Sequence, residues 1–180
     1  AYAHYDRGIV RAAASKLQEA RADFSTSIDH LRTIVARKWS SPSRARAHAQ
    51  IAAQALVNRA IVAVWAGKCG SDCLADLDEA ARIEHSCSAK NEEMIEGLAG
   101  VPATIDAGVL AVTKSQRRAV NVLLQRSLVL LRLGRAADAA NACAAAMAAH
   151  RSRRDDASPP SSDEFALILN CLAVALGGMT

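Results

Sequence analysis

Three cysteines and one histidine form the grouping of side chains that comes nearest to a metal site. Cys69, Cys73, His85 and Cys87 have the spacing C-x3-C-x11-H-x-C. Zinc needs four such ligands in a tetrahedron, and this spacing is not that of a standard zinc site. Packing in a helix already explains Cys73. We therefore predict no metal site and no cofactor, and we keep a redox- or metal-responsive adaptor that uses Cys69, Cys73 and Cys87 as the most distant alternative.

The other reactive side chains give no catalytic motif. None of the 5 histidines stands in a Ser/His/Asp or Cys/His motif. The turn from Gly67 to Gly70 lacks the lysine that grips phosphate in a P-loop. Asp72, Asp76, Asp78 and Glu79 lie on one face of an expected helix, which is more often a solvated face than an acid/base pair. We predict that the chain is not an enzyme.

A short basic segment is the other chemically distinctive feature. Arg37, Lys38, Arg44 and Arg46 flank Trp39, in a chain with 22 basic and 18 acidic residues and a net charge of +4. These cations could meet the phosphates of RNA while Trp39 stacks on a base. They could equally contact a neighbouring protein. We favour the protein because nucleic-acid binding usually requires a broader basic field.

The composition predicts that α-helices position these residues. The chain is 51% hydrophobic but only 3% aromatic, it is rich in alanine, and it has 4 prolines and 9 glycines. Alanine is the strongest helix former and allows helices to approach closely. An alternating strand pattern is not found. We predict helices over about 3–14, 17–38, 44–66, 72–85, 117–133 and 135–151, with serines at 40, 41 and 43 available to cap the third.

One spacing of small residues occurs three times along the chain. Two stretches have the intervals 12, 4 and 3, and a third has 13, 4 and 3, one residue longer in the expected turn. The residues are Gly8, Ala20, Phe24 and Ser27; Ser127, Ala139, Cys143 and Ala146; and Ala60, Cys73, Leu77 and Ala80. A repeated helix pair is typical of a solenoid, which binds partners along a groove.

These stretches resemble the tetratricopeptide repeat family. The resemblance rests on Asn121 to His150 and Ala55 to Ile83, each with a helix, a glycine turn and a second helix, and on the first 31 residues. It implies an all-α fold, a right-handed α-solenoid of antiparallel helix pairs. The copies depart from the family in having Arg7, Arg59 and Arg126 where a large residue is usual.

The spacing between copies predicts irregular insertions. The first small residues of successive copies are Gly8, Ala60, Ser127 and, in the partial unit, Cys171. They lie 52, 67 and 44 residues apart, whereas the family period is about 34 residues. We expect one helical-repeat domain over 1–180, with units at about 1–38, 44–86 and 117–151 and a partial unit at 162–180. The segment 88–114 is a degenerate helix pair or a plain insertion. We also expect the chain to be part of a longer protein.

The resemblance further implies which residues form a groove, because the first helix of each pair lines the concave face in this family. The face mixes aromatic, aliphatic and amide groups, which suit an extended peptide or a helix. Packing on an adjoining segment is the competing interpretation for Ile61 and Leu128. The residues are Tyr2, Tyr5, Ile9, Gln54, Asn58, Ile61, Trp65, Asn121, Gln125, Leu128 and Arg132.

A carboxylate clamp, as in family members that bind acidic chaperone tails, is not expected. Asn58 matches the clamp asparagine of the second repeat. Tyr5 and Ile9 replace the lysine and asparagine of the first repeat, and Asn121 and Gln125 replace the lysine and arginine of the third. An anionic tail would lack its charge partners.

The sequence therefore predicts a non-catalytic scaffold, an accessory subunit of a larger intracellular complex, with other protein subunits as partners. The alternative is a helical-repeat component of an RNA-protein assembly. The apolar stretch from Phe165 to Leu176 is too short to span a bilayer, so we expect no membrane insertion. The odd cysteine count favours a reducing compartment; we favour the cytoplasm and leave an organelle open.

Overall fold

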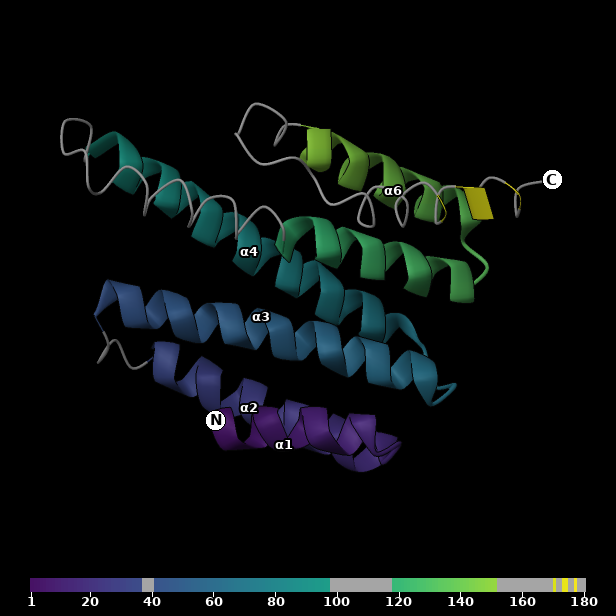
Figure 1. Ribbon diagram of the computed structural model, residues 1–180, viewed down its shortest axis with the longest axis horizontal. Helices are drawn as coiled ribbons and strands as arrows, with labels where there is room; N and C mark the ends of the chain where they lie inside the picture. The colour runs from purple at the N-terminus through teal and green to yellow at the C-terminus, as the bar shows by residue number, and fades with distance from the viewer. Residues whose placement is uncertain (37–40, 98–117, 152–169, 171–172, 175–176, 178–180) are drawn as a thin grey trace. The chain divides into compact units, whose positions relative to one another are not determined.

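The computed structural model describes residues 1–36, 41–97 and 118–151, together with 170, 173–174 and 177. Every regular element among them is an α-helix, which confirms the all-α prediction (Figure 1). The helices are α1 (Tyr2–Ala13), α2 (Leu17–Ala36), α3 (Pro42–Trp65), α4 (Ser71–Gly97), an unlabelled helix over 118–132, and α6 (Ala136–Arg151). The predicted partial unit at 162–180 lies almost wholly outside the described residues.

The length of α4 differs from the prediction. We expected this helix to end near His85, and it continues to Gly97. The reason is local, because the sequence has no proline or glycine between Ser71 and Gly97 to stop it. The first arm of the candidate helix pair at 88–114 is thus the end of α4, while residues 98–117 lie outside the described part of the chain.

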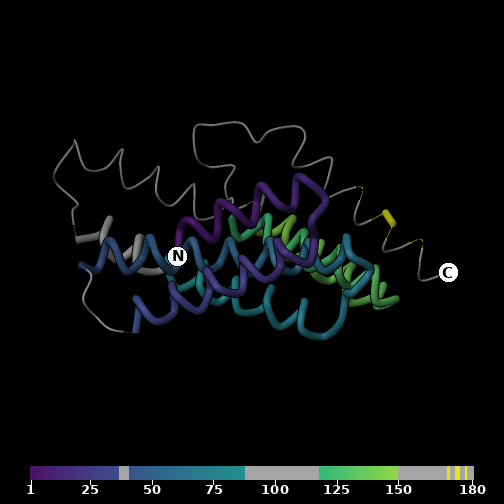
Figure 2. The backbone as a smooth tube through the Cα atoms, turned by 90° about the horizontal axis from the view of Figure 1, so that it is seen from below, coloured from purple at the N-terminus to yellow at the C-terminus, as the bar shows by residue number. Residues whose placement is uncertain are grey.

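Two compact units divide the chain, and their boundary falls inside α4. The first unit is Ala1–Ile83 and the second is Glu84–Thr180. In the first unit the chain reverses between α1 and α2, as the tube in Figure 2 shows, and α2 packs against both α1 and α3. The Ser41 side chain accepts a hydrogen bond from the backbone N–H of Arg44 and so caps α3, as the serines there predict.

The three helix pairs are closed by the same turn. Ser15, Gly67 and Gly134 adopt left-handed backbone conformations, with φ of 60°, 67° and 71°. Each lies seven residues beyond the first small residue of its copy. In each turn the following residue donates its backbone N–H to the carbonyl five residues earlier, which satisfies a helix C-terminus. These bonds join Lys16 to Arg11 (2.8 Å), Lys68 to Ala63 (2.9 Å) and Arg135 to Leu130 (2.9 Å).

The repeated small residues lie at the helix contacts. All twelve positions of the repeated spacing are buried, as the spacing predicts. The contact is closest at Gly8, where an added Cβ would lie 2.8 Å from the ring of Phe24. Because real Cβ atoms do not approach so closely, only glycine fits there without moving Phe24.

Paired charges explain two of the three unusual arginines. Arg7 donates from Nε and Nη2 to the Asp23 carboxylate at 2.6–3.1 Å, and Arg11 adds a bond from Nη1 at 2.7 Å. Arg59 donates likewise to Asp76, at 2.8 and 2.7 Å. Each arginine therefore ties the first helix of a pair to the second. In the third copy, the residue corresponding to Asp23 is Ala142.

Asp23 is the most strongly compensated of these acids. Its side chain is only 4% exposed, and its carboxylate also lies 3.5 Å from His4 Nδ1. The hydrogen bond from Arg7 holds the pKa of Asp23 down at about 2, against the opposing effect of burial; His4 and Arg11 add to the lowering.

Candidate binding groove

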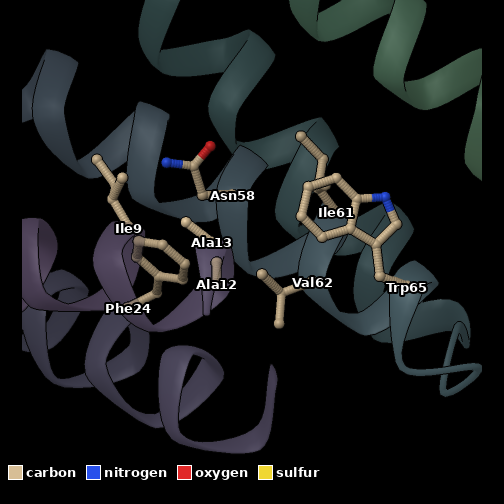
Figure 3. Close-up of a pocket in the computed structure, with 8 residues that line it drawn as sticks. All are labelled: Ile9, Ala12, Ala13, Phe24, Asn58, Ile61, Val62 and Trp65. Carbon is tan, nitrogen blue, oxygen red and sulfur yellow. The ribbon is translucent and has the colours of Figure 1, made fainter. Parts of the chain in front are cut away.

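An apolar groove of about 410 Å³ opens in the first unit between α1 and α3, over α2 (Figure 3). Its lining is aliphatic or aromatic apart from one amide, that of Asn58. The lining residues are Ile9, Ala12, Ala13, Phe24, Asn58, Ile61, Val62 and Trp65.

Helical periodicity brings these side chains to one place. On α1, residues 9, 12 and 13 share a face, and on α3, residues 58, 61, 62 and 65 do. Phe24 reaches the groove from α2 and is buried. Ala12 and Ala13 are short, so the α1 side remains open. Trp65 is 64% exposed and Ile9 is 44% exposed, so large apolar surfaces lie open to a partner.

This groove is lined by four of the residues that were predicted to form one. They are Ile9, Asn58, Ile61 and Trp65. Ile61 is half-buried and still part of the lining. The sequence-based selection missed Ala12, Ala13, Phe24 and Val62, because small or buried residues look the same in a sequence whether they fill a core or line a groove. Their i, i+3 and i+4 spacing from Ile9 and Asn58 was the available signal for three of them.

The other residues predicted on α1 and α3 form a polar border. Asn58 Nδ2 donates to the Tyr5 hydroxyl at 3.3 Å, and Gln54 Nε2 donates to Asn58 Oδ1 at 3.4 Å. Tyr2 makes an edge contact with the His48 ring, with centroids 5.8 Å apart. Burial raises the pKa of Tyr5, which the hydrogen bond from Asn58 opposes, so its hydroxyl is neutral at physiological pH.

The residues predicted in the third copy belong to the second unit. They lie on the helix over 118–132, where Gln125 Nε2 donates to Asn121 Oδ1 at 3.5 Å. This amide pair has the same register as Gln54 and Asn58 in the second copy. Leu128 is 38% exposed, and Arg132 is exposed as well.

The structure describes only half of the predicted basic patch. Arg37, Lys38 and the adjacent Trp39 lie outside the described residues. Arg44 is exposed and Arg46 is half-buried, both near the beginning of α3. The patch therefore stays a prediction.

Most of the described cysteines are buried. Cys73, Cys87 and Cys143 are buried and Cys69 is half-buried. Burial raises the pKa of Cys73 to about 11, against a backbone hydrogen bond at Gly70, so at neutral pH it is a thiol and not a nucleophilic thiolate. Within the described ranges no group of three or more His, Cys, Asp or Glu side chains could hold a metal ion.

One buried acid in the second unit behaves differently from Asp23. Burial raises the pKa of Glu84 to about 7, and the charge of Arg118 opposes this rise only in part.

Among the helices that the structure describes, we find none with the length and apolar character needed to cross a membrane.

Comparisons with known proteins give no assignment. The chain matches no family model, no curated protein and no solved structure. The groove and its surroundings are therefore interpreted from their own chemistry.

Proposed function

We propose that the protein is a non-catalytic helical-repeat scaffold that binds an apolar segment of a partner protein in the groove between α1 and α3. The observation that carries the proposal is the groove itself, which is almost wholly apolar and has an exposed Trp65 at its border. Exposed apolar surface of this kind marks interaction sites, and tryptophan is enriched among residues that dominate binding energy.

The arrangement of helices in the first unit supports a two-layer repeat. Arg21 and Arg32 of α2 pair with Asp72 and Glu79 of α4, so the second helices of neighbouring pairs run side by side in the same direction. Tyr2 and Tyr5 of α1 meet His48 and Asn58 of α3, in the same order along both helices, so the first helices do the same. From these contacts we infer a tetratricopeptide-like solenoid. We propose that this solenoid acts as an accessory subunit of a larger complex.

A folded adaptor suits the described chemistry better than an enzyme does. The groove has a single polar lining residue, Asn58, and its amide donates to the neutral hydroxyl of Tyr5. Burying the exposed part of Trp65 would contribute about 2–3 kcal/mol before the costs of association. Such a site can grip a peptide or a helix through apolar anchors.

The experiment is affinity capture of the tagged full-length chain from its own cells, with and without nuclease. We expect a set of proteins that survives nuclease and that Trp65→Ala reduces at least about tenfold. Val10→Ala is the matched control, because Val10 is exposed on α1 outside the groove. Equal capture by both variants, or loss of all partners on nuclease treatment, would contradict the proposal.

A further inference from the structure

We propose that the segment bound in this groove carries an acidic side chain directly beyond its apolar anchors, and that Lys16 and Lys68 hold this side chain. The inference rests on the proposed function and specifies the chemistry of the partner. The groove carries opposite charges at its two ends.

The same register places a cation at the end of each groove-lining helix. We number positions from the first small residue of each copy, which is Gly8 on α1 and Ala60 on α3. Positions −2, +1 and +5 lie on one face of the helix, and position +8 lies directly after the turn. On α1 these positions are Asp6, Ile9, Ala13 and Lys16, and on α3 they are Asn58, Ile61, Trp65 and Lys68. Each lysine is thus three residues beyond a residue that lines the groove.

The two lysines lie at the same end of the groove. Tyr2 contacts His48 and Tyr5 meets Asn58, so α1 and α3 run in the same direction and end together. The backbone of each lysine is fixed by its hydrogen bond to the preceding helix, at 2.8 Å for Lys16 and 2.9 Å for Lys68. Both side chains are exposed.

These lysines differ from four arginines of the first unit. Arg7, Arg21, Arg32 and Arg59 all pair with acids of a neighbouring helix. Within the described residues, no acid pairs with Lys16 or Lys68. A cation at a helix C-terminus favours the helix dipole by a few tenths of a kcal/mol, and this effect leaves both charges available to a ligand.

The opposite end of the groove carries the opposite charge. Asp6 is exposed, lies one helical turn before Ile9, and makes no ion pair within the described residues. A bound segment therefore meets two positive charges at one end and one negative charge at the other. This polarity favours an acidic residue beyond the apolar anchors and sets the direction in which the segment lies.

The side chains that line the groove make RNA the less suitable occupant. The groove offers one exposed aromatic ring, Trp65, between aliphatic walls, whereas single-stranded RNA stacks its bases on several aromatic side chains. The occupant we propose is consequently a polypeptide.

The test is selection from a displayed library of random 12-residue peptides on the full chain, alongside a pool of random RNA. We expect enriched peptides in which Asp or Glu follows bulky apolar residues. The variant with both Lys16→Glu and Lys68→Glu should instead enrich Lys or Arg at that position. It should bind the original peptides about tenfold more weakly at low salt, whereas Arg82→Glu, an exposed control on α4, should leave their affinity unchanged.

The outcomes separate this inference from the function on which it rests. Suppose that peptide binding depends on Trp65, but that the peptides show no preference for an acidic residue, or that the lysine substitutions leave this preference unchanged. This result would overturn the inference and leave the proposed function in place. If no peptide requires Trp65, or if RNA binds there instead, both are overturned. Thermal unfolding followed by circular dichroism would show that the exposed-site variants remain folded.

Discussion

The first two helix pairs share a register but differ in the contacts that hold their helices together. In the α1/α2 pair, Gly8 admits the ring of Phe24, Asp23 is buried under two arginines, and Ser15 holds the left-handed position of the turn. In the α3/α4 pair, the corresponding positions hold Ala60, Leu77, Asp76 and Gly67.

This difference shows that one helix-pair plan can be stabilised in two ways. The first pair depends on an enclosed ion pair and on a tight glycine contact, and it tolerates an unfavourable backbone at Ser15. The second pair depends on alanine packing and on a more exposed ion pair, since the Asp76 side chain is 14% exposed. Exchanging features between the pairs should therefore change the stability of each pair by a different amount.

Removing the acid should destabilise the first pair more than the second. We expect Asp23→Ala to lower the free energy of unfolding by about 3 kcal/mol, because it leaves two arginines beside a buried site. Asp76→Ala should cost about 1–2 kcal/mol. Urea unfolding of both variants measures the difference, and equal losses would contradict the distinction between the pairs.

The Asp23 carboxylate also predicts a response to acid. Its pKa is about 2 in the folded chain, below the usual 3.8, so its stabilisation is present above about pH 4 and is lost as pH falls toward 2. The loss amounts to about 2 kcal/mol. Asp23→Asn should flatten stability over this range, as unfolding curves at several pH values would show.

Filling the glycine contact should disturb the first pair alone. Gly8→Ala should destabilise by about 2 kcal/mol, because the new Cβ collides with Phe24. Phe24→Leu, which gives the first pair the leucine of the second, should relieve the collision, so the double variant should be more stable than the sum of the single losses predicts. Simple additivity would show that Gly8 is not required by this contact.

Glu84 extends the comparison to the second unit with the opposite sign. Its folded pKa of about 7 exceeds the usual 4.5, so its contribution is fully present below about pH 4.5 and is lost as pH rises through 7. Glu84→Gln should remove this decline, whereas Asp23→Asn should leave it intact. If the decline in stability persists in the Glu84→Gln variant, another titrating group causes it.

The turn gives the smallest expected change. Ser15→Gly should stabilise the chain by about 0.5–1 kcal/mol, because a left-handed conformation is costly for residues with a Cβ. Gly67→Ser, the reverse exchange in the second pair, should destabilise by a similar amount. Chemical denaturation detects both, and a loss of stability in Ser15→Gly would mean that the serine side chain contributes more than its backbone conformation costs.

The sequence predicted the positions of the helices because these depend on local periodicity. The spacing of Gly8, Ala60 and Ser127 identified buried positions, whereas Asn58, Ile61 and Trp65 were expected in a groove only because of the resemblance to a repeat family. It did not reveal that Phe24 forms part of the lining or that Asp23 partners Arg7, because these contacts join helices whose facing residues the spacing does not specify. The extra length of α4 was missed because the repeat pattern ends before the helix does.

Photo-crosslinking from residue 61 inside cells would show whether a polypeptide occupies the groove. A photoreactive amino acid at position 61 lies in the groove, and one at position 10 lies on α1 outside it. The account predicts a polypeptide joined at position 61 and not at position 10, and retained after nuclease treatment. Equal crosslinking at both positions, or crosslinks to RNA alone, would contradict it.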